Sequence, residues 1–413
     1  MPLQPSRTVA ELRELRELTG DENGAQRVAW TDTWAKAREW LRAKVADTGA
    51  TESVDAAGNQ WFTLGGGSDR AVLLGGHIDS VPNGGWLDGC LNVMAGVEVL
   101  RRIAADGAPP VTVRLVNWAD EEGARFGRSL FGSSAAAGSM TDQAELRGRR
   151  DADGTALPDA LAGQGVDLDR ALDARSELDG AAAYLELHIE QGPVLESMQL
   201  PLGVVLGTFG VERHQVTYRG QAAHAGSTPM DKRRDALAGA AKLELEIREI
   251  AKRTGEGAVC TMGGVVTKPG IVTSVVETAE CLLDQRHLDA ARLASMLASA
   301  REASERFAAE EEIAVEWERI WNIEPILFDE RLVELADESI REVAGPSHRL
   351  PSGPLHDAAE VARAGVPTVM VFVQSLHGLS HTKLEDTKEE HLELSVQALD
   401  RLAAKTIDLV AAQ

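Results

Sequence analysis

Cysteine is scarce in this chain. The 413 residues include three cysteines, Cys90, Cys260 and Cys281, and they form no C-x-x-C pair. An odd and small number of cysteines in a long chain excludes a disulfide framework, and without paired cysteines a zinc site built from thiolates is not expected. We therefore predict a protein of a reducing compartment, with the cytoplasm as the simplest location.

The sequence also has few basic residues and no long apolar run. Lys and Arg number 42 against 65 Asp and Glu, so the formal net charge is -23. This balance argues against nucleic acid and against anionic membrane surfaces as partners, since both require basic residues. No run approaches the roughly 18 apolar residues of a membrane span, and the first residues lack the apolar core of a secretory signal. The expected partner is a small-molecule substrate.

The order of the expected elements indicates two domains. Strands at 71–74 and 111–118 flank a buried helix at 91–107, a rhythm typical of an α/β domain whose mainly parallel sheet is covered by helices. From about residue 210, two long amphipathic helices and about four strands form a small α+β sandwich. We therefore predict a larger domain of residues 1–209 and 326–413, interrupted by an inserted domain of residues 210–325.

Histidines and carboxylates cluster where the expected strands end, beside glycines. In open parallel sheets, ligands bind at the carboxyl ends of the strands. The stretch "GGHIDS" offers His77, with Asp79 placed to orient its imidazole. Other stretches offer side chains of the same chemistry: Asp88 in "GGWLDG", Glu121 and Glu122 in "ADEEG", His188 in "LELHIEQG" and His381 in "GLSHTK".

Each of these residues alone has an ordinary structural explanation. A histidine at a strand end is commonly a satisfied polar residue, paired glutamates commonly begin a solvated helix, and Asp between glycines is a usual turn residue. Their joint occurrence after apolar runs favours a metal centre. Three acids at 120–122 would repel one another if buried, and two divalent ions bridged by one carboxylate would offset that repulsion. Imidazole and carboxylate ligands without thiolate suit Zn, Mn, Co or Ni.

Several motifs, taken in order and spacing, resemble the M20 metallopeptidase-like amidohydrolases: "GGHIDSVPNGGWLDG", "DEEGARFG", "LELHIEQGPVLE", "GQAAHAG", "SGPLHDA" and "LSHT". The similarity extends from about Asp55 to Glu385, and "HIEQGP" points to the branch with N-carbamoyl-L-amino-acid hydrolases, β-ureidopropionases and allantoate amidohydrolases. The resemblance implies a di-zinc exopeptidase-like catalytic domain with helices on both faces of its sheet. It also implies that the inserted domain is a lid that mediates a homodimer.

The resemblance further implies two divalent metal ions with one shared ligand. His77 and His188 match ligands of the first metal, Glu122 and His381 match ligands of the second, and Asp88 matches the bridging carboxylate.

The remaining residues of the "ADEEG" and "GGHIDS" stretches receive other roles. Glu121 matches the family's general base, and Asp79 matches the residue that orients His77. As a base, Glu121 would take a proton from the attacking water and later pass it to the leaving nitrogen. Asp120 is interpreted as a residue that contacts the metal ligands without binding metal itself.

Substrate contacts are implied at further positions. Gln191 matches a glutamine that contacts substrate, and His224 matches a histidine that reaches the substrate, in the dimer often from the partner subunit. Arg286 matches an arginine that grips the substrate carboxylate. His356, in "SGPLHDA", is a plausible further contact.

One departure from the family pattern bears on the substrate. Thr273 stands where the branch usually has an Asn that helps Arg286 bind the carboxylate, and Val276 stands where it has Pro. Losing an amide hydrogen bond to a charged group costs roughly 1.5–3 kcal/mol. Either another residue compensates, or the substrate differs near its carboxylate or lacks one. Other departures are Cys90 and Asn92 after the bridging Asp, and Gln374 and His377 near His381.

These residues favour a hydrolase of a linear C–N bond that acts on an N-carbamoyl or ureido-type substrate. The alternative within the enzyme class is an N-acyl or N-formyl amide hydrolase, or a dipeptidase-like activity. The alternative from another class is a non-catalytic binding protein that kept the fold. Retention of every ligand and of Glu121 argues against this last reading.

Overall fold

The computed structural model describes residues 2–413, which divide into two compact units. The larger unit comprises Met1–Leu206 with Phe328–Gln413, and the smaller unit comprises Gly207–Leu327. Among the described residues, no helix has both the length and the apolar character needed to cross a membrane.

The larger unit alternates strands and helices along most of its length. Its N-terminal part runs α1 (Pro5–Thr19), β1 (Gly20–Asp21), β2 (Gly24–Ala25), α2 (Asp32–Val45), the 3-10 helix η1 (Ala46–Thr48), β3 (Thr51–Val54), β4 (Gln60–Leu64), β5 (Ala71–His77), α3 (Cys90–Asp106), β6 (Thr112–Trp118), α4 (Phe131–Ala137), α5 (Gln143–Leu146), α6 (Leu157–Gly163), η2 (Leu168–Leu178), β7 (Ala181–Ile189), α7 (Val194–Ser197) and β8 (Leu202–Thr208). Its C-terminal part runs α10 (Glu330–Ala344), β16 (His348–Ser352), α11 (Asp357–Arg363), β17 (Thr368–Val373), η4 (Leu376–Gly378) and α12 (Glu389–Ala411).

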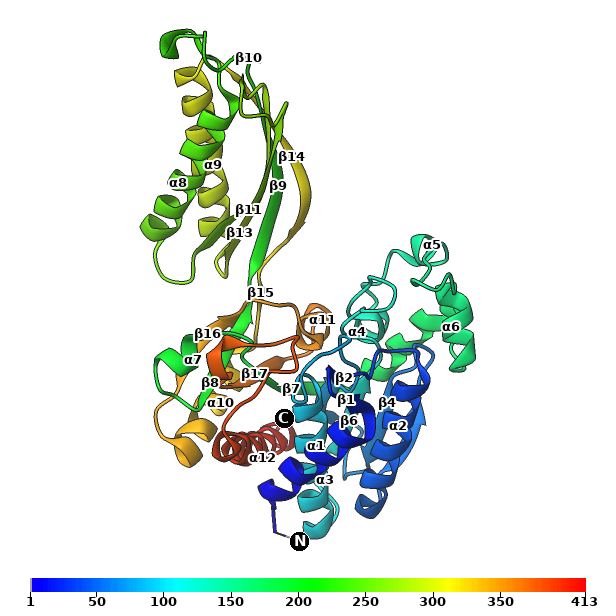
Figure 1. Ribbon diagram of the computed structural model, residues 1–413. Coiled ribbons are helices and arrows are strands. Elements are labelled where there is room, and N and C mark those ends of the chain that lie inside the picture. Colours follow the sequence, from blue (N-terminus) through cyan, green and yellow to red (C-terminus); the bar gives the residue numbers. More distant parts are fainter. Residues whose placement is uncertain (1) are drawn as a thin grey trace. The chain divides into compact units, whose positions relative to one another are not determined.

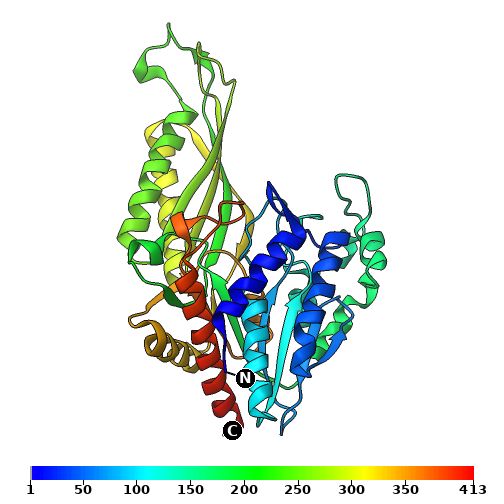
Figure 2. The ribbon, with the colours of Figure 1, turned by 60° about the horizontal axis from the view of Figure 1, so that its bottom comes forward.

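The large sheet has a parallel centre and antiparallel flanks. Its strand order is β15-β8-β17-β7-β5-β6-β4-β3, with β15 (Ile326–Leu327) at one edge and β16 also paired to β8. The pairs β17–β7, β7–β5 and β5–β6 are parallel, whereas β8–β17, β6–β4 and β4–β3 are antiparallel. Helices α3 and α12 pack against one side of the sheet, and α1 packs on both of these helices (Figure 2). Helix α11 packs against the central strands on the other side, and α4 packs on α11 (Figure 1). The parallel strands are apolar because both faces are buried.

Strand β5 is longer than its apolar run predicts. The run indicates a strand over 71–74, whereas β5 continues through Gly75 and Gly76 to His77. Glycine is required here because Tyr184 of β7 lies against β5, and a Cβ at Gly75 would stand 2.4 Å from the Tyr184 ring. His77 is therefore the last residue of a buried strand, at the carboxyl edge of the parallel sheet.

The smaller unit is an antiparallel sheet covered by two long helices. Its elements are β9 (Gly210–Arg219), β10 (Ala223–His224), η3 (Met230–Lys232), α8 (Ala236–Thr254), β11 (Val259–Lys268), β12 (Ser274–Val275), β13 (Thr278–His287), α9 (Ala290–Glu310), β14 (Ala314–Ile323) and β15. The main sheet has the order β11-β13-β9-β14, and α8 and α9 pack side by side on it (Figure 1). Asp235 and Asp289 cap these helices through the backbone N–H groups of Leu237 and Arg292.

Candidate active site

His77 and Asp79 organise the end of strand β5. The His77 Nδ1 atom lies 3.1 Å from the Asp79 backbone carbonyl oxygen and 3.6 Å from its carboxylate. The Asp79 carboxylate instead accepts the backbone N–H groups of Glu121, at 3.3 Å, and Glu122, at 3.1 Å. If Nδ1 donates to the carbonyl, Nε2 of the neutral imidazole carries the lone pair. That buried Nε2 has no hydrogen-bond partner among residues 2–413.

Asp88 stands between two groups of side chains and offers one oxygen to each. Its Oδ1 lies 3.0 Å from His188 Nε2 and 3.8 Å from His77 Nε2, and its Oδ2 lies 3.4 Å from His381 Nε2. The next residue, Gly89, has φ 66°, and a Cβ there would stand 2.4 Å from the His77 ring. Glycine thus allows Asp88 to approach the imidazole before helix α3 begins.

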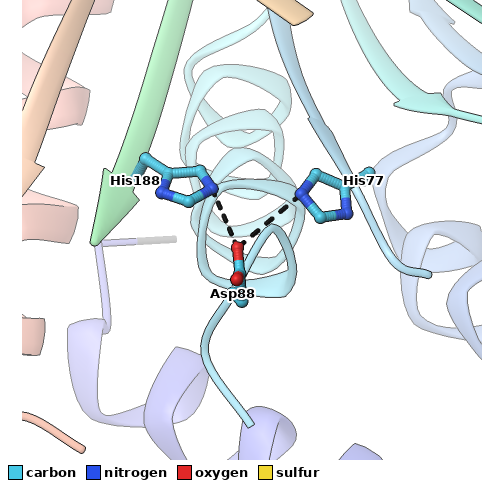
Figure 3. Close-up of side chains that lie close together, drawn as sticks. All are labelled: His77, Asp88 and His188. Carbon is cyan, nitrogen blue, oxygen red and sulfur yellow. Dashed lines mark ion pairs between the residues drawn. The ribbon is translucent and has the colours of Figure 1, made fainter. Parts of the chain in front are cut away.

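The first group, His77, Asp88 and His188, is buried (Figure 3). His77 ends β5, His188 lies near the end of β7, and Asp88 lies in the turn before α3. Both imidazoles point toward the Asp88 carboxylate in Figure 3. The His188 Nδ1 lies 2.8 Å from the Ile189 carbonyl oxygen, so this ring also presents Nε2 to the group. Imidazole nitrogens fixed in this way are ready-made metal ligands.

The second group consists of Asp88, Glu122 and His381. The Glu122 Oε2 lies 3.3 Å from His381 Nε2, and its Oε1 accepts the Val81 backbone N–H at 3.3 Å. His381 is about half exposed, at 52%, and lies in the turn after β17 with φ 56°. The second group is therefore more open to solvent than the first.

The acids at 120–122 form a turn. If residues 120–122 continued the strand, the side chains of Glu121 and Glu122 would point to opposite sides of it. The structure differs, because β6 ends at Trp118 and Asp120 is left-handed, with φ 56°. Asp120 accepts the Trp30 indole N–H at 2.6 Å and the Gly123 N–H at 3.1 Å, which stabilises the turn. Glu121 Oε2 then lies 3.7 Å from His77 Nε2, while Glu122 faces His381.

Burial and mutual repulsion raise the pKa values of these carboxylic acids. Burial raises the pKa of Glu121 well above its ordinary value. Burial, together with Asp88, raises the pKa of Glu122 to about 7, and burial with Asp79 raises the pKa of Asp120 to about 8. His381 is hydrogen-bonded to Asp88, and this raises its pKa to about 9. Positive charge at this position would relieve the repulsion.

Two of the expected substrate contacts lie beside these groups. The Gln191 side-chain N–H groups donate to Asp88 Oδ2 and to Ser380 Oγ, both at 2.9 Å, so its Oε1 is the free acceptor. That Oε1 is buried and has no hydrogen-bond partner in the described part of the chain. The His356 ring lies 4.3 Å from the His188 ring, and burial holds its pKa well below the ordinary value. His356 is therefore neutral.

The other expected contacts belong to the smaller unit, at opposite ends of its sheet. His224 in β10 pairs with Ser274, and the Ala225 N–H donates to the Thr273 carbonyl oxygen, so His224 and Thr273 are neighbours. Arg286, near the other end of β13, forms an ion pair with Asp284 at 2.7 Å. Thr278 and Arg286 are eight residues apart on one strand, which corresponds to about 27 Å. Thr273 and Arg286 of one chain therefore do not meet.

The departures noted in the sequence have structural roles. Asn92 Oδ1 accepts the Leu187 backbone N–H at 2.9 Å, next to His188, and Cys90 Sγ lies 2.9 Å from a buried Arg27 nitrogen. Gln374 donates to the Leu200 carbonyl oxygen at 3.1 Å. His377 is exposed, and its backbone N–H donates to Glu196 at 2.8 Å.

Sequence reasoning missed Trp30, Ser380 and Glu385. Trp30 is the hydrogen-bond donor to Asp120, and Ser380 and Glu385 contact the turn of Asp88. Ser380 directly precedes the expected ligand His381, and this position is the only signal in the sequence that points to it.

Comparisons with known proteins agree with this fold and identify the family. Residues 73–405 match the model of peptidase family M20/M25/M40. The chain is 36% identical to an N-carbamoyl-L-amino acid amidohydrolase of Geobacillus stearothermophilus, over 94% of this chain and 95% of that protein. It is 33% identical to an allantoate amidohydrolase of Escherichia coli, over 91% of each. A hydantoinase/carbamoylase family amidase structure from Burkholderia multivorans matches with TM-score 0.87 and 32% identity, over 97% of each chain.

The chain therefore belongs to the M20 peptidase family. Within that family it is an amidohydrolase, an enzyme that hydrolyses carbon–nitrogen bonds other than peptide bonds.

The clustered acids predict how the stability of the metal-free protein depends on pH. A group whose pKa is raised on folding contributes stability that is lost as pH rises through the folded value. Asp120 (about 8), Glu122 (about 7) and His381 (about 9) all act in this direction between pH 6.5 and 8. His356 acts in the opposite direction, because its pKa is lowered on folding and its contribution to stability therefore increases with pH. That contribution no longer changes above the unfolded histidine pKa of about 6.5. We expect the midpoint of thermal unfolding of the metal-free protein to fall over this range.

Asp120→Asn is the matched variant, since it removes one titrating group and keeps an acceptor for Trp30. The fall in midpoint should be shallower in this variant, and added Mn²⁺ should reduce it in the wild-type protein, because metals bind deprotonated ligands. A midpoint that rises from pH 6.5 to 8 would contradict this account.

Proposed function

We propose that this protein hydrolyses an N-carbamoyl or ureido-type substrate with two divalent metal ions bridged by Asp88. The observation that carries the proposal is the position of Asp88, which directs Oδ1 to one pair of histidines and Oδ2 to His381. The names of the relatives, N-carbamoyl-L-amino acid amidohydrolase and allantoate amidohydrolase, support this substrate class.

The side chains fit two ions. The buried His77 Nε2 lacks a partner among the described residues, and each group has imidazole and carboxylate donors without thiolate. This donor set suits Zn, Mn, Co or Ni. His77, Asp88 and His188 would hold the first ion, and Asp88, Glu122 and His381 the second. When bound, such ions polarise a carbonyl group and make the attacking water more acidic.

Glu121 is the proposed general base. Its Oε2 lies 3.7 Å from His77 Nε2 of the first group, although Glu121 belongs to neither group. Burial raises its pKa, so it can hold a proton during turnover. It would accept a proton from the attacking water and donate it to the leaving nitrogen. Asp79 would position both His77 and the Glu121 backbone, through the contacts described above.

Two amide-recognition groups are proposed around the reacting carbonyl. The His224 Nδ1 accepts the Gly226 N–H at 3.1 Å, so the neutral ring carries its proton on Nε2 and can donate it to a developing oxyanion. The Gln191 Oε1 is a buried acceptor without a partner in residues 2–413. A carbamoyl substrate can donate an N–H hydrogen bond to this oxygen. An acyl or formyl substrate has no N–H group at that position. Gln191 therefore favours the carbamoyl class over the N-acyl or N-formyl alternative, and His356 would line the same space.

We further propose a homodimer in which the smaller unit acts as lid. His224 and Thr273 are separated from Arg286 of the same chain by most of strand β13. A small substrate cannot reach both ends of that strand. If all three residues contact one substrate, two copies of the chain must contribute them.

Replacement of the base separates catalysis from metal binding. We expect Glu121→Gln to lower kcat about 10²- to 10⁴-fold, the usual contribution of a positioned general base, with the metal content unchanged. Glu122→Gln is the contrast, because it removes a proposed ligand and should lower the metal content as well. Metal content is measured by elemental analysis after gel filtration. Wild-type turnover in folded Glu121→Gln would show that the base is assigned wrongly.

A matched pair of substrates tests the carbamoyl class. We expect Mn²⁺-loaded protein to release ammonia from N-carbamoyl amino acids, with a higher kcat/KM than for the N-acetyl counterparts. In Gln191→Met the ratio between the two should fall by about 10-fold or more, because the variant cannot accept an N–H group. Comparing two substrates in one variant cancels any general loss of activity. A preference for N-acetyl substrates in the wild type would favour the acylase alternative.

Thr273→Asn tests whether Thr273, in place of the family Asn, reflects a substrate that differs at its carboxylate. If Thr273 reflects a substrate with an altered or absent carboxylate, restoring the amide should lower KM for carboxylate substrates about 10- to 100-fold, the equivalent of one charged hydrogen bond. KM for matched carboxylate-free amides should not change. Ile271→Asn, two residues away in the same exposed turn, is the control. An unchanged KM in Thr273→Asn would mean that another residue compensates.

A further inference from the structure

Glu385 is a buried carboxylate that no step above uses. It lies between η4 and α12, is 2% exposed, and follows the expected ligand His381 by four residues. Buried carboxylates are costly unless hydrogen bonds satisfy them. The partners of Glu385 therefore indicate what this residue does.

All of these partners are parts of the site. Glu385 Oε1 accepts the backbone N–H groups of Leu87, at 3.0 Å, and of Asp88, at 3.1 Å. Its Oε2 accepts the hydroxyl of Ser380 at 3.1 Å. One carboxylate thus connects the turn that carries Asp88 with the turn that carries His381.

The approach of Glu385 to the Asp88 turn depends on a glycine. A Cβ at Gly85 would stand 2.0 Å from Glu385 Oε1, so only glycine leaves room for the carboxylate. The neighbouring side chain reinforces the contact, because the Trp86 indole N–H donates to Asp386 at 3.3 Å.

Ser380 extends the link to the bridging carboxylate itself. Its Oγ lies 3.1 Å from Asp88 Oδ2 and 3.1 Å from Glu385 Oε2. Because a hydroxyl has one proton, it serves both carboxylates by sharing or alternation. Asp88 Oδ2 is also the oxygen that faces His381.

The two groups of ligands differ in how they are held. His77 and His188 lie on paired strands of the sheet, whereas His381 is half exposed, in a turn, and left-handed at φ 56°. A left-handed conformation is unfavourable for a non-glycine residue, so this turn needs other contacts to fix it. The contacts of Glu385 and Ser380 meet that need.

We propose that Glu385 is a positioning residue for the second metal group, Asp88, Glu122 and His381. This inference rests on the proposed function. Through Leu87, Asp88 and Ser380, Glu385 fixes the distance between the Asp88 and His381 turns. It thereby sets the affinity for the second ion and leaves the first ion, held by His77, Asp88 and His188, largely unaffected.

The test is a Mn²⁺ titration of the metal-free full-length chain, by calorimetry, with bound metal measured after gel filtration. In Glu385→Ala we expect the second equivalent to bind about 10- to 100-fold more weakly, the usual effect of losing a residue that orients a ligand. The first equivalent should bind as in the wild type. Glu385→Gln and Ser380→Ala should show smaller losses, since each keeps part of the linkage.

Glu98→Gln is the matched control. Glu98 is also buried and accepts a backbone N–H, from Gln4 at 2.6 Å, together with Arg7 at 2.7 Å, but it contacts no proposed ligand. Both equivalents should bind this variant as they bind the wild type. Circular dichroism establishes that each variant is folded, and if Glu385→Ala is not, the other two variants decide.

Two results would overturn the inference. One is wild-type binding of both equivalents by folded variants of Glu385 and Ser380. The other is equal weakening of both equivalents, which would assign Glu385 a general structural role. A wild-type protein that binds no Mn²⁺, Zn²⁺, Co²⁺ or Ni²⁺ would instead overturn the proposed function, so the two failures are distinguishable.

Discussion

The repulsion among the buried carboxylates around Asp88 is the constraint on which the rest of the larger unit depends. Asp88, Glu121 and Glu122 converge at one edge of a sheet whose interior excludes water. Isolated charges in such a place are costly, and backbone N–H groups and histidines are the neutralising groups that the chain itself supplies. The strands therefore have to end where these groups can reach the acids. β5 ends at a histidine, and the turn after β6 presents its N–H groups to Asp79.

Unusual backbone conformations accompany this arrangement. Asp120, Gln191 and His381 all have φ close to 57° and are not glycines. Each such residue carries a cost, and such residues concentrate at functional sites where surrounding contacts hold them in place. Here the contacts can be named: Trp30 and Gly123 bond to Asp120, Asp88 bonds to the Gln191 side chain, and Ser380 connects the His381 turn to Glu385.

The parts of the site that follow apolar strands could be predicted from the sequence. His77 and His188 stand at the carboxyl ends of strands, where parallel sheets usually bind ligands. The family motifs indicated the other expected ligands. The turn at Asp120 could not be predicted, because nothing in "ADEEG" distinguishes an extended segment from a left-handed turn. Glu385 was missed because its partner Asp88 is 297 residues away, and no local pattern reports such a contact. The role of the Asp79 carboxylate was missed for the same reason, since it bonds to the backbone of a different strand end.

Whether Thr273 and Arg286 of one chain can bind the same carboxylate could be decided only from the strand register of β13. In the sequence the two are thirteen positions apart, which is compatible with joint binding of one carboxylate. The pairing of β13 with β9 removes that possibility within one chain, because an extended strand converts sequence distance into length. A hairpin over the same residues would have brought them together. If His224 recognises the reacting amide and Arg286 a carboxylate, as proposed, then different copies of the chain must supply these two residues to one substrate. The proposed dimer is the arrangement that lets a rigid sheet, longer than the substrate, contribute both of its ends to catalysis.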